Sequence, residues 1–269
     1  MKRKNQPNAD RPRLRVGPAL TVALALMLVA GDALPFGWKA HALIAERAQH
    51  ELKPAAAATV KQLLSAIDAR SMSEVAAWAD QHRNRTTARW HYINLPPGTC
   101  HYVAKRDCPD GNCLVEAIRT QQRILADTSR SPRARGHALR YLIHLVGDAY
   151  QPLHAGRYAD RGGNRYQVNI DGRGSNLHRL WDTGLARYRP NLRHEVLLAP
   201  TQSLVPSPPR AWVERSCQIV NRNGFYPSHK PTPAYLEWAA GLYARQIERA
   251  GDRLALVLNR TLKRASPHE

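Results

Sequence analysis

The chain has 269 residues, 43% of them hydrophobic, and carries 40 Lys and Arg against 21 Asp and Glu, a formal net charge of +19. This length allows one large domain with a sizeable core, or at most two small domains, and excludes a larger multidomain architecture. The positive charge is spread along the chain, and such a surface attracts polyanions such as nucleic acid, anionic membranes or acidic sugars.

The first 35 residues have the pattern of an export signal. Six basic residues precede the uncharged apolar run PALTVALALMLVAG (18–31), and the small residues of GDALP (31–35) follow. The run is shorter than the about 20 residues that span a bilayer, so an uncleaved anchor is the weaker interpretation. We expect residues 1–35 to be a removed signal peptide. Residues 36–269 are expected to form a monomeric domain in the periplasm or outside the cell, without stable membrane association.

After residue 36 the hydrophobic pattern is mostly helical. Ser73 and Ser131 are placed as N-caps, and Pro132 suits a first helical turn. The predicted helices cover 41–52, 54–67, 73–83, 113–126, 131–151, 208–225 and 233–262. Residues 162–177 are the exception, because their glycines and the alternating YQVNI predict a loop or a short hairpin. One all-α domain is the simplest interpretation.

The four cysteines predict disulfides, because an even number of cysteines in an exported chain is typical of a disulfide framework. Three pairings are possible. Cys108 and Cys113 flank the turn-forming run PDGN, so a bridge between them would close a small loop and leave Cys100 with Cys217. A zinc site of four cysteines is the weaker alternative, because Cys217 is far away in the sequence.

The stretch YLIHLVGDAYQPLHAGR (141–157) concentrates possible metal ligands. His144 and Asp148 are spaced i, i+4, as are His178 and Asp182, so each pair would share one helix face. One such pair alone is more often a surface ion pair. The full set of His and Asp residues in ligand-like settings is His41, Asp80, His91, His144, Asp148, His154, His178 and Asp182. Nitrogen and carboxylate ligands without thiolates suit zinc, and this set is too large for one tetrahedral ion. The alternative is a half-buried helix whose histidines are satisfied by hydrogen bonds.

The segments FGWKAH, WADQHR, WHYINLP, HLVGDAYQPLH, GGN and NLHRLWD occur in this order along the chain. Together they resemble the zinc-dependent, single-strand-specific nuclease and 3'-nucleotidase family, known from fungal, plant and bacterial secreted enzymes. The resemblance covers essentially all of residues 36–265. It implies a compact all-helical domain with three zinc ions in a cleft, a fold shared with bacterial zinc phospholipases C. The disulfides of this family are also compatible with Cys100–Cys217 and Cys108–Cys113.

The resemblance implies three ligand sets. The first zinc would be held by Asp80, His91, His144 and Asp148. The second would take Asp148 as a bridge, His41, and the free amino group and carbonyl of Phe36 at the mature N-terminus. The third, more exposed, would take His154, His178 and Asp182. The chain departs from the family pattern at two positions, since the family usually has Trp where Phe36 stands and Gly where Ala40 stands.

The implied reaction is phosphodiester hydrolysis of single-stranded DNA and RNA to 5'-phosphate products, with 3'-nucleotides as further substrates. Asp80 would orient the attacking water, and Arg83 would steady the charge on the phosphate. Tyr92 would stack an unpaired base, although a core position for this tyrosine is equally compatible with the sequence. Asn94 and Asn164 would contact base or phosphate.

Two alternatives stay open from the sequence. A zinc phospholipase C-like phosphodiesterase would use the same fold and ligands, although the cysteine pattern, Arg83 and the positive charge favour nucleic acid. A secreted basic protein with structural zinc would need closed sites of four protein ligands. The set His154, His178 and Asp182 offers only three, which argues against that protein.

Overall fold

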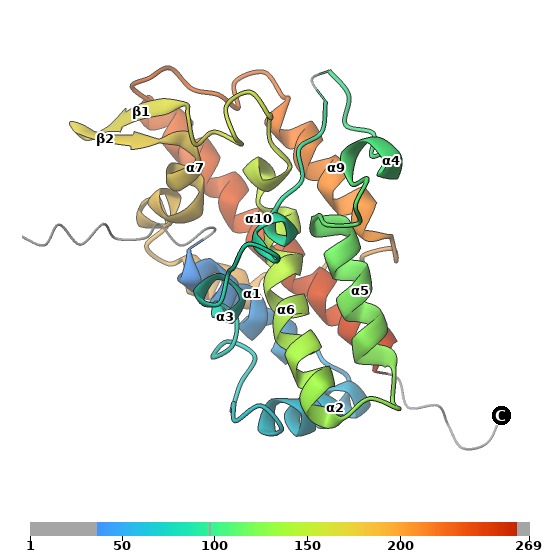
Figure 1. Cartoon of the computed structure of the whole chain (residues 1–269). Coiled ribbons are helices and arrows are strands. Elements are labelled where there is room, and N and C mark those ends of the chain that lie inside the picture. Colours follow the sequence, from blue (N-terminus) through green and yellow to red (C-terminus); the bar gives the residue numbers. More distant parts are fainter. Residues whose placement is uncertain (1–36, 97, 263–269) are drawn as a thin grey trace, which may run out of the picture. The chain divides into compact units, whose positions relative to one another are not determined.

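A computed structural model of the chain describes residues 37–96 and 98–262. They form helices and a single two-stranded sheet within the described part (Figure 1). The α-helices are α1 (Trp38–His50), α2 (Pro54–Ser65), α3 (Trp78–Gln81), α4 (Ala104–Asp107), α5 (Leu114–Ala126), α6 (Pro132–Tyr150), α7 (Leu177–Arg179), α8 (Leu192–Leu198), α9 (Pro209–Val220) and α10 (Pro233–Thr261). Shorter helical turns are η1 (Ala88–His91), η2 (Pro152–Ala155), η3 (Leu180–Gly184) and η4 (Leu185–Tyr188), and the strands are β1 (Gln167–Ile170) and β2 (Arg173–Asn176). The prediction of an all-α domain is therefore confirmed.

Helix α6 is the central element. Ser131 caps it, since its Oγ accepts a hydrogen bond from the backbone N–H of Ala134 at 3.2 Å, and Pro132 occupies the first turn. The helix packs against α1, α2, α3, α5, α9 and α10, and is buried continuously from Leu142 to Tyr150 (Figure 1). A buried helix can carry polar side chains only where these find partners. In this stretch α6 carries the polar side chains of His144 and Asp148.

The longest helix, α10, holds the other side of the core. Thr232 caps it by accepting a hydrogen bond from the N–H of Tyr235 at 3.2 Å, and it packs closely against α1 and α6. In the described part of the chain, no helix combines the length and hydrophobicity needed to cross a bilayer.

The hairpin follows from its turn. β1 pairs antiparallel with β2, with Ile170 opposite Arg173, so the loop is the dipeptide Asp171-Gly172. Both residues have positive φ, 53° and 80°, as the tight two-residue hairpin turn requires. The prediction of a loop or a short hairpin for 162–177 is confirmed, with the hairpin at 167–176 and the loop before it packed against Leu153 of η2.

Two predicted helices are shorter than expected. The helix predicted for 208–225 ends at Val220, as α9. The helix predicted for 73–83 forms only as α3, while residues 72–77 are turns and Ser73 does not cap it. Both disulfides expected from the sequence are present, joining Cys100 to Cys217 and Cys108 to Cys113. The first bridge ties the loop after η1 to α9.

Candidate metal centre

The carboxylate of Asp148, in the last turn of α6, lies at the centre of a buried cluster of four histidines. Its Oδ1 lies 3.5 Å from Nε2 of His41 and 3.1 Å from Nδ1 of His154. Its Oδ2 lies 3.0 Å from Nδ1 of His91 and 3.2 Å from Nε2 of His144. Asp148 has no exposed surface, and the histidines are at most 3% exposed. Segments that are far apart in the sequence therefore converge on one carboxylate.

Asp80 completes a first ligand group with His91 and His144. Its Oδ1 lies 3.3 Å from Nδ1 of His91 and 3.4 Å from Nε2 of His144, and the two ring nitrogens are 3.2 Å apart. The three ligand atoms lie within 4.8 Å of one another, and Asp148 faces the same two histidines. The expected first set of four ligands is therefore brought together by α3, η1 and α6.

His41 forms a second group with His144 and Asp148. Its ring stacks on that of His144 with 3.9 Å between centroids, and Gly147 makes this approach possible. A Cβ at Gly147 would lie 2.6 Å from Nδ1 of His41. The expected set for this ion did not include His144, which the structure places in reach of both groups. Phe36, the expected N-terminal ligand, lies outside the described residues.

The third group combines His154, His178 and Asp182. Asp182 Oδ2 lies 3.3 Å from Nε2 of His178, and Asp182 Oδ1 lies 3.9 Å from Nε2 of His154. The two imidazole rings are stacked, with centroids 5.1 Å apart. Asp182 is positioned by η3, where the neighbouring Trp181 is fully buried and stacks on Phe225 at 4.6 Å. The His178 side chain is 16% exposed, so this group reaches the surface while the others do not.

Hydrogen bonds to the outer atoms fix the orientation of these side chains. His144 donates from Nδ1 to the carbonyl of Ala76 at 2.8 Å, and His178 donates from Nδ1 to the carbonyl of Gly162 at 2.7 Å. The fully buried Gln151 donates from Nε2 to Oδ1 of Asp182 at 2.7 Å. A donated Nδ1 proton leaves Nε2 of each ring with its lone pair facing the cluster, which is how metal-binding histidines are held.

The charges in the cluster are strongly coupled. Burial alone would lower the pKa of His144, but the carboxylates of Asp148 and Asp80 raise it well above 6.5. Burial would raise the pKa of Asp148, but His144 and His154 hold it well below 3.8. Burial, together with the charge of His144, lowers the pKa of His41. The buried carboxylates therefore favour the protonated form of His144, whereas the surroundings of His41 favour its neutral form.

The buried atoms fit divalent cations. Within the described part of the chain, the buried atoms Asp80 Oδ1, Asp148 Oδ1 and His154 Nδ1 have close contacts in the cluster but none with hydrogen-bond geometry. Buried polar atoms are costly unless they are paired or coordinate metal. Imidazole nitrogens and carboxylate oxygens, without a thiolate, are a donor set that suits zinc.

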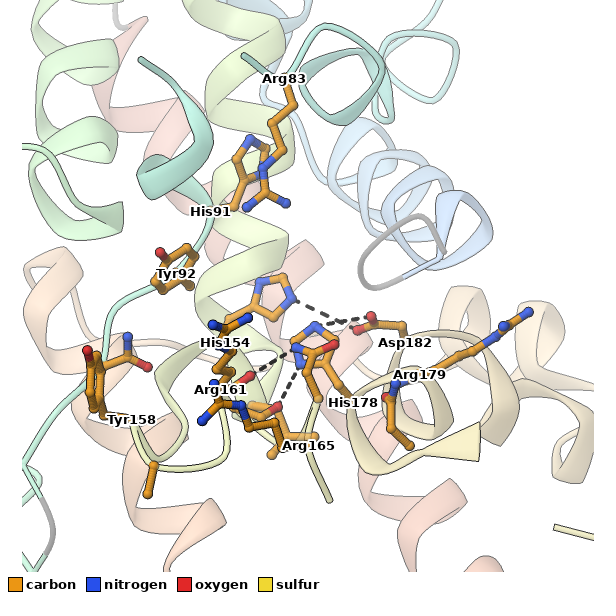
Figure 2. A pocket seen from close by; sticks show the side chains of 16 residues that line it. Arg83, His91, Tyr92, His154, Tyr158, Arg161, Arg165, His178, Arg179 and Asp182 are labelled. Atoms are coloured by element: carbon orange, nitrogen blue, oxygen red, sulfur yellow. Dashed lines mark hydrogen bonds and ion pairs between the residues drawn. The ribbon is translucent and has the colours of Figure 1, made fainter. Parts of the chain in front are cut away.

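The third group opens into a pocket of about 690 Å³, within the range of about 300–1,000 Å³ that is usual for ligand sites. The four residues named from the sequence as substrate contacts all line it, namely Arg83, Tyr92, Asn94 and Asn164. Arg83 and Tyr92 can be seen in Figure 2. Asp80 does not line it. The structure therefore brings the four expected contact residues together around one cavity.

Sequence reasoning missed four pocket residues with charged or aromatic side chains, which are Tyr158, Arg161, Arg165 and Arg179. The three arginines follow no fixed spacing and come from the loop before β1 and from α7, so no sequence motif connects them. The sequence signal that could have identified two of them is the position of Arg161 and Arg165 on either side of GGN.

The sequence of residues 36–263 matches the family model described as S1/P1 nuclease. Nuclease P1 from Penicillium citrinum is 36% identical over 155 residues, which are 55% of this chain and 57% of that protein. Endonuclease 2 from Arabidopsis thaliana is 33% identical over 178 residues, 62% of this chain and 61% of that protein. Nuclease S1 from Aspergillus oryzae is 31% identical over 183 residues, 65% of this chain and 61% of that protein. The matched regions thus span somewhat over half the length of these relatives. Because the family model covers most of the sequence, and because the His and Asp groups lie together as the resemblance implied, the chain belongs to the S1/P1 nuclease family.

Proposed function

We propose that this protein is a zinc-dependent endonuclease that hydrolyses phosphodiester bonds in single-stranded DNA and RNA to 5'-phosphate products, and that it also removes phosphate from 3'-nucleotides. One observation carries the proposal. Three His and Asp groups lie next to one another, and the third opens into a pocket that is also lined by arginines and an exposed tyrosine. Family membership supports the same reaction class.

The proposed metal sites follow the three groups. Asp80, His91, His144 and Asp148 would hold one zinc ion, and His154, His178 and Asp182 would hold a more exposed one. His41 and Asp148 would hold the remaining ion together with the amino group and carbonyl of Phe36. That assignment requires removal of residues 1–35 and export to the periplasm or the medium. We propose that the mature protein acts as a monomer.

Zinc bound in these groups would supply Lewis acidity and lower the pKa of bound water from 15.7 to about 7. In the hydrolysis, the water oxygen bonds to phosphorus and the bond from phosphorus to the 3' oxygen breaks. Asp80 would orient the water, because its buried Oδ1 lies 3.3 Å from Nδ1 of His91 and 3.4 Å from Nε2 of His144, among the side chains that would hold the ion. The proton that the water loses passes to solvent. The leaving 3' oxygen takes up a proton from solvent through the open side of the pocket.

Arg83 would offset the charge that builds up on phosphorus oxygens during the reaction. Its guanidinium lines the pocket and is held by donating from Nη2 to the carbonyl of Ala88 at 2.9 Å. This bond still leaves most of its donors available to a phosphate.

Tyr92 supports the preference for unpaired strands. It directly follows His91, lines the pocket and is 36% exposed, so its ring is available to a base that has left its stack. Asn94 lines the same cavity, and Asn164 is held by donating from Nδ2 to the carbonyl of Arg161 at 2.9 Å. Both would contact the base edge or the phosphate.

The test uses protein that begins at Phe36, assayed on circular single-stranded DNA, linear RNA, duplex DNA and a 3'-nucleotide. Each assay is run as isolated, after chelation and after zinc is restored. We expect loss of activity on chelation, recovery with zinc, faster cleavage of single strands than of duplex, and 5'-phosphate ends by mass analysis. A chelated protein that cleaves at the original rate, or products that carry mainly 3'-phosphates, would refute the proposal.

A further inference from the structure

Three arginine side chains lie around the third metal group, and none pairs with an acidic residue in the described part of the chain. Arg161 and Arg165 lie to one side of His178, and the side chain of Arg179 extends away on the other side (Figure 2). All three are exposed and line the same pocket as His154 and His178. None of the three makes an ion pair with any residue in the described ranges 37–96 and 98–262.

The nearby acids are engaged elsewhere. Asp160 precedes Arg161 in the chain, but its Oδ1 accepts a hydrogen bond from the N–H of Gly163 at 2.9 Å, and its Oδ2 accepts one from the hydroxyl of Tyr226 at 2.6 Å. Burial, and then the Asp160 carboxylate, raise the pKa of Tyr226, so the hydroxyl stays a donor. Asp171 pairs with Arg187 at 3.7 Å.

The pocket wall is therefore positive. Asp182 is the sole acidic residue among the described residues that line the pocket, against four arginines. Its carboxylate is already committed to His178, His154 and Gln151. Such a wall attracts more than one anionic group, because guanidinium groups without partners in a partly enclosed cavity favour phosphate.

The loop that carries two of the arginines is held in a costly conformation. Arg161 has φ 54°, and Gly162 and Gly163 follow with φ 61° and 81°. A left-handed conformation is unusual for a residue with a side chain and persists only when its surroundings enforce it. Here the Asp160 bonds enforce it, and a Cβ at Gly162 would lie 2.4 Å from the carbonyl oxygen of Leu153. The loop is thus fixed against η2 with Arg161 at the pocket wall.

We infer that Arg161, Arg165 and Arg179 form a phosphate-binding subsite that holds the phosphates on either side of the one being cleaved. The subsite makes the protein select oligonucleotides over dinucleotides and 3'-nucleotides. This inference rests on the proposed nuclease function, and it adds that the enzyme prefers longer substrates. A dinucleotide has one phosphodiester, which lies in the reaction centre during cleavage. It therefore has no second phosphate for the three arginines to bind.

The test compares a thymidine octanucleotide with a thymidine dinucleotide as substrates of the zinc-loaded protein. The variant combines Arg161→Gln, Arg165→Gln and Arg179→Gln. We expect the ratio of kcat/KM for the octanucleotide to that for the dinucleotide to fall at least about tenfold, mostly through KM. The slope of log affinity against log salt for the octanucleotide should become shallower by about 2, because each phosphate contact on a single strand contributes about 0.7.

The matched control removes the same charge elsewhere, by Arg70→Gln, Arg210→Gln and Arg222→Gln, three exposed arginines away from the pocket lining. The control should keep the substrate ratio of the unaltered protein, and thermal unfolding should show that both triple variants fold. An unchanged ratio in the pocket variant, or an equal loss in both variants, would overturn the subsite. If the unaltered protein cleaves neither substrate, the proposed function itself fails.

Discussion

Replacing Asp148 by Asn should be the most damaging single change in the cluster. The substitution keeps the shape of the side chain but removes one negative charge from a site with no exposed surface. That charge faces His41 and His154 through one oxygen and His91 and His144 through the other. Two proposed metal sites share this carboxylate, so both should lose affinity together.

The magnitude follows from linkage between binding and folding. A metal that binds only the folded state at 100 times its Kd adds about 2.7 kcal/mol per site, so losing two sites costs about 5 kcal/mol. A domain of this size changes its Tm by about 2–4 °C per kcal/mol, which gives a decrease of about 10–20 °C with zinc present. Activity should fall by at least about 100-fold, because even the groups that only orient metal ligands are worth 10–100-fold.

The assay is thermal unfolding of the original protein and the Asp148→Asn variant, each with zinc and with chelator, alongside elemental analysis. The difference in Tm should be large with zinc and small with chelator. Asp68→Asn is the matched control, because the Asp68 side chain is 93% exposed and should show no change in either condition. An Asp148→Asn protein that retains its zinc content and its activity would refute the reasoning.

Three further predictions use other parts of the structure. Gly147→Ala should displace His41, since the added Cβ would lie 2.6 Å from its Nδ1. Elemental analysis should then show one zinc fewer. The control is Gly174→Ala, which has open space around its Cβ position and should bind zinc normally. Cys100→Ser opens a loop of 117 residues and should lower the urea unfolding free energy by about 2–5 kcal/mol; a loss below 1 kcal/mol would contradict this. The neighbouring carboxylates raise the pKa of His144 above 6.5, so the metal-free protein should lose stability as pH rises through that pKa while its zinc affinity increases. Titrations between pH 6 and pH 8 that give one constant zinc affinity would exclude this coupling.

The helices and the metal groups were largely predictable because both follow short-range rules. Hydrophobic spacing with the Ser131 cap defined α6, and the i, i+4 pairs placed His144 with Asp148 and His178 with Asp182. The two pairs reach the same spacing differently, since the second lies on α7 and the wider turn of η3. The joining of the groups through Asp148 was accessible only through the family resemblance.

The features that the sequence did not predict depend on contacts between distant segments. The pattern of 73–83 is helical, yet the chain forms turns before α3, and the carbonyl of Ala76 in these turns accepts the Nδ1 proton of His144. Arg161 and Arg165 are likewise ordinary loop residues until Asp160 bonds to Tyr226, and neither then forms an ion pair with a described acidic residue. The secondary-structure propensity of a short segment does not depend on such long-range contacts, so it cannot predict them.

The most direct test of the central claim is a crystal structure of protein that begins at Phe36, with anomalous difference maps collected on both sides of the zinc absorption edge. We predict three zinc peaks per chain. One should lie among Asp80, His91, His144 and Asp148, one between His41 and Asp148 beside the N-terminal amino group, and one among His154, His178 and Asp182. A single peak in active protein, or zinc bound away from Asp148, would contradict the account.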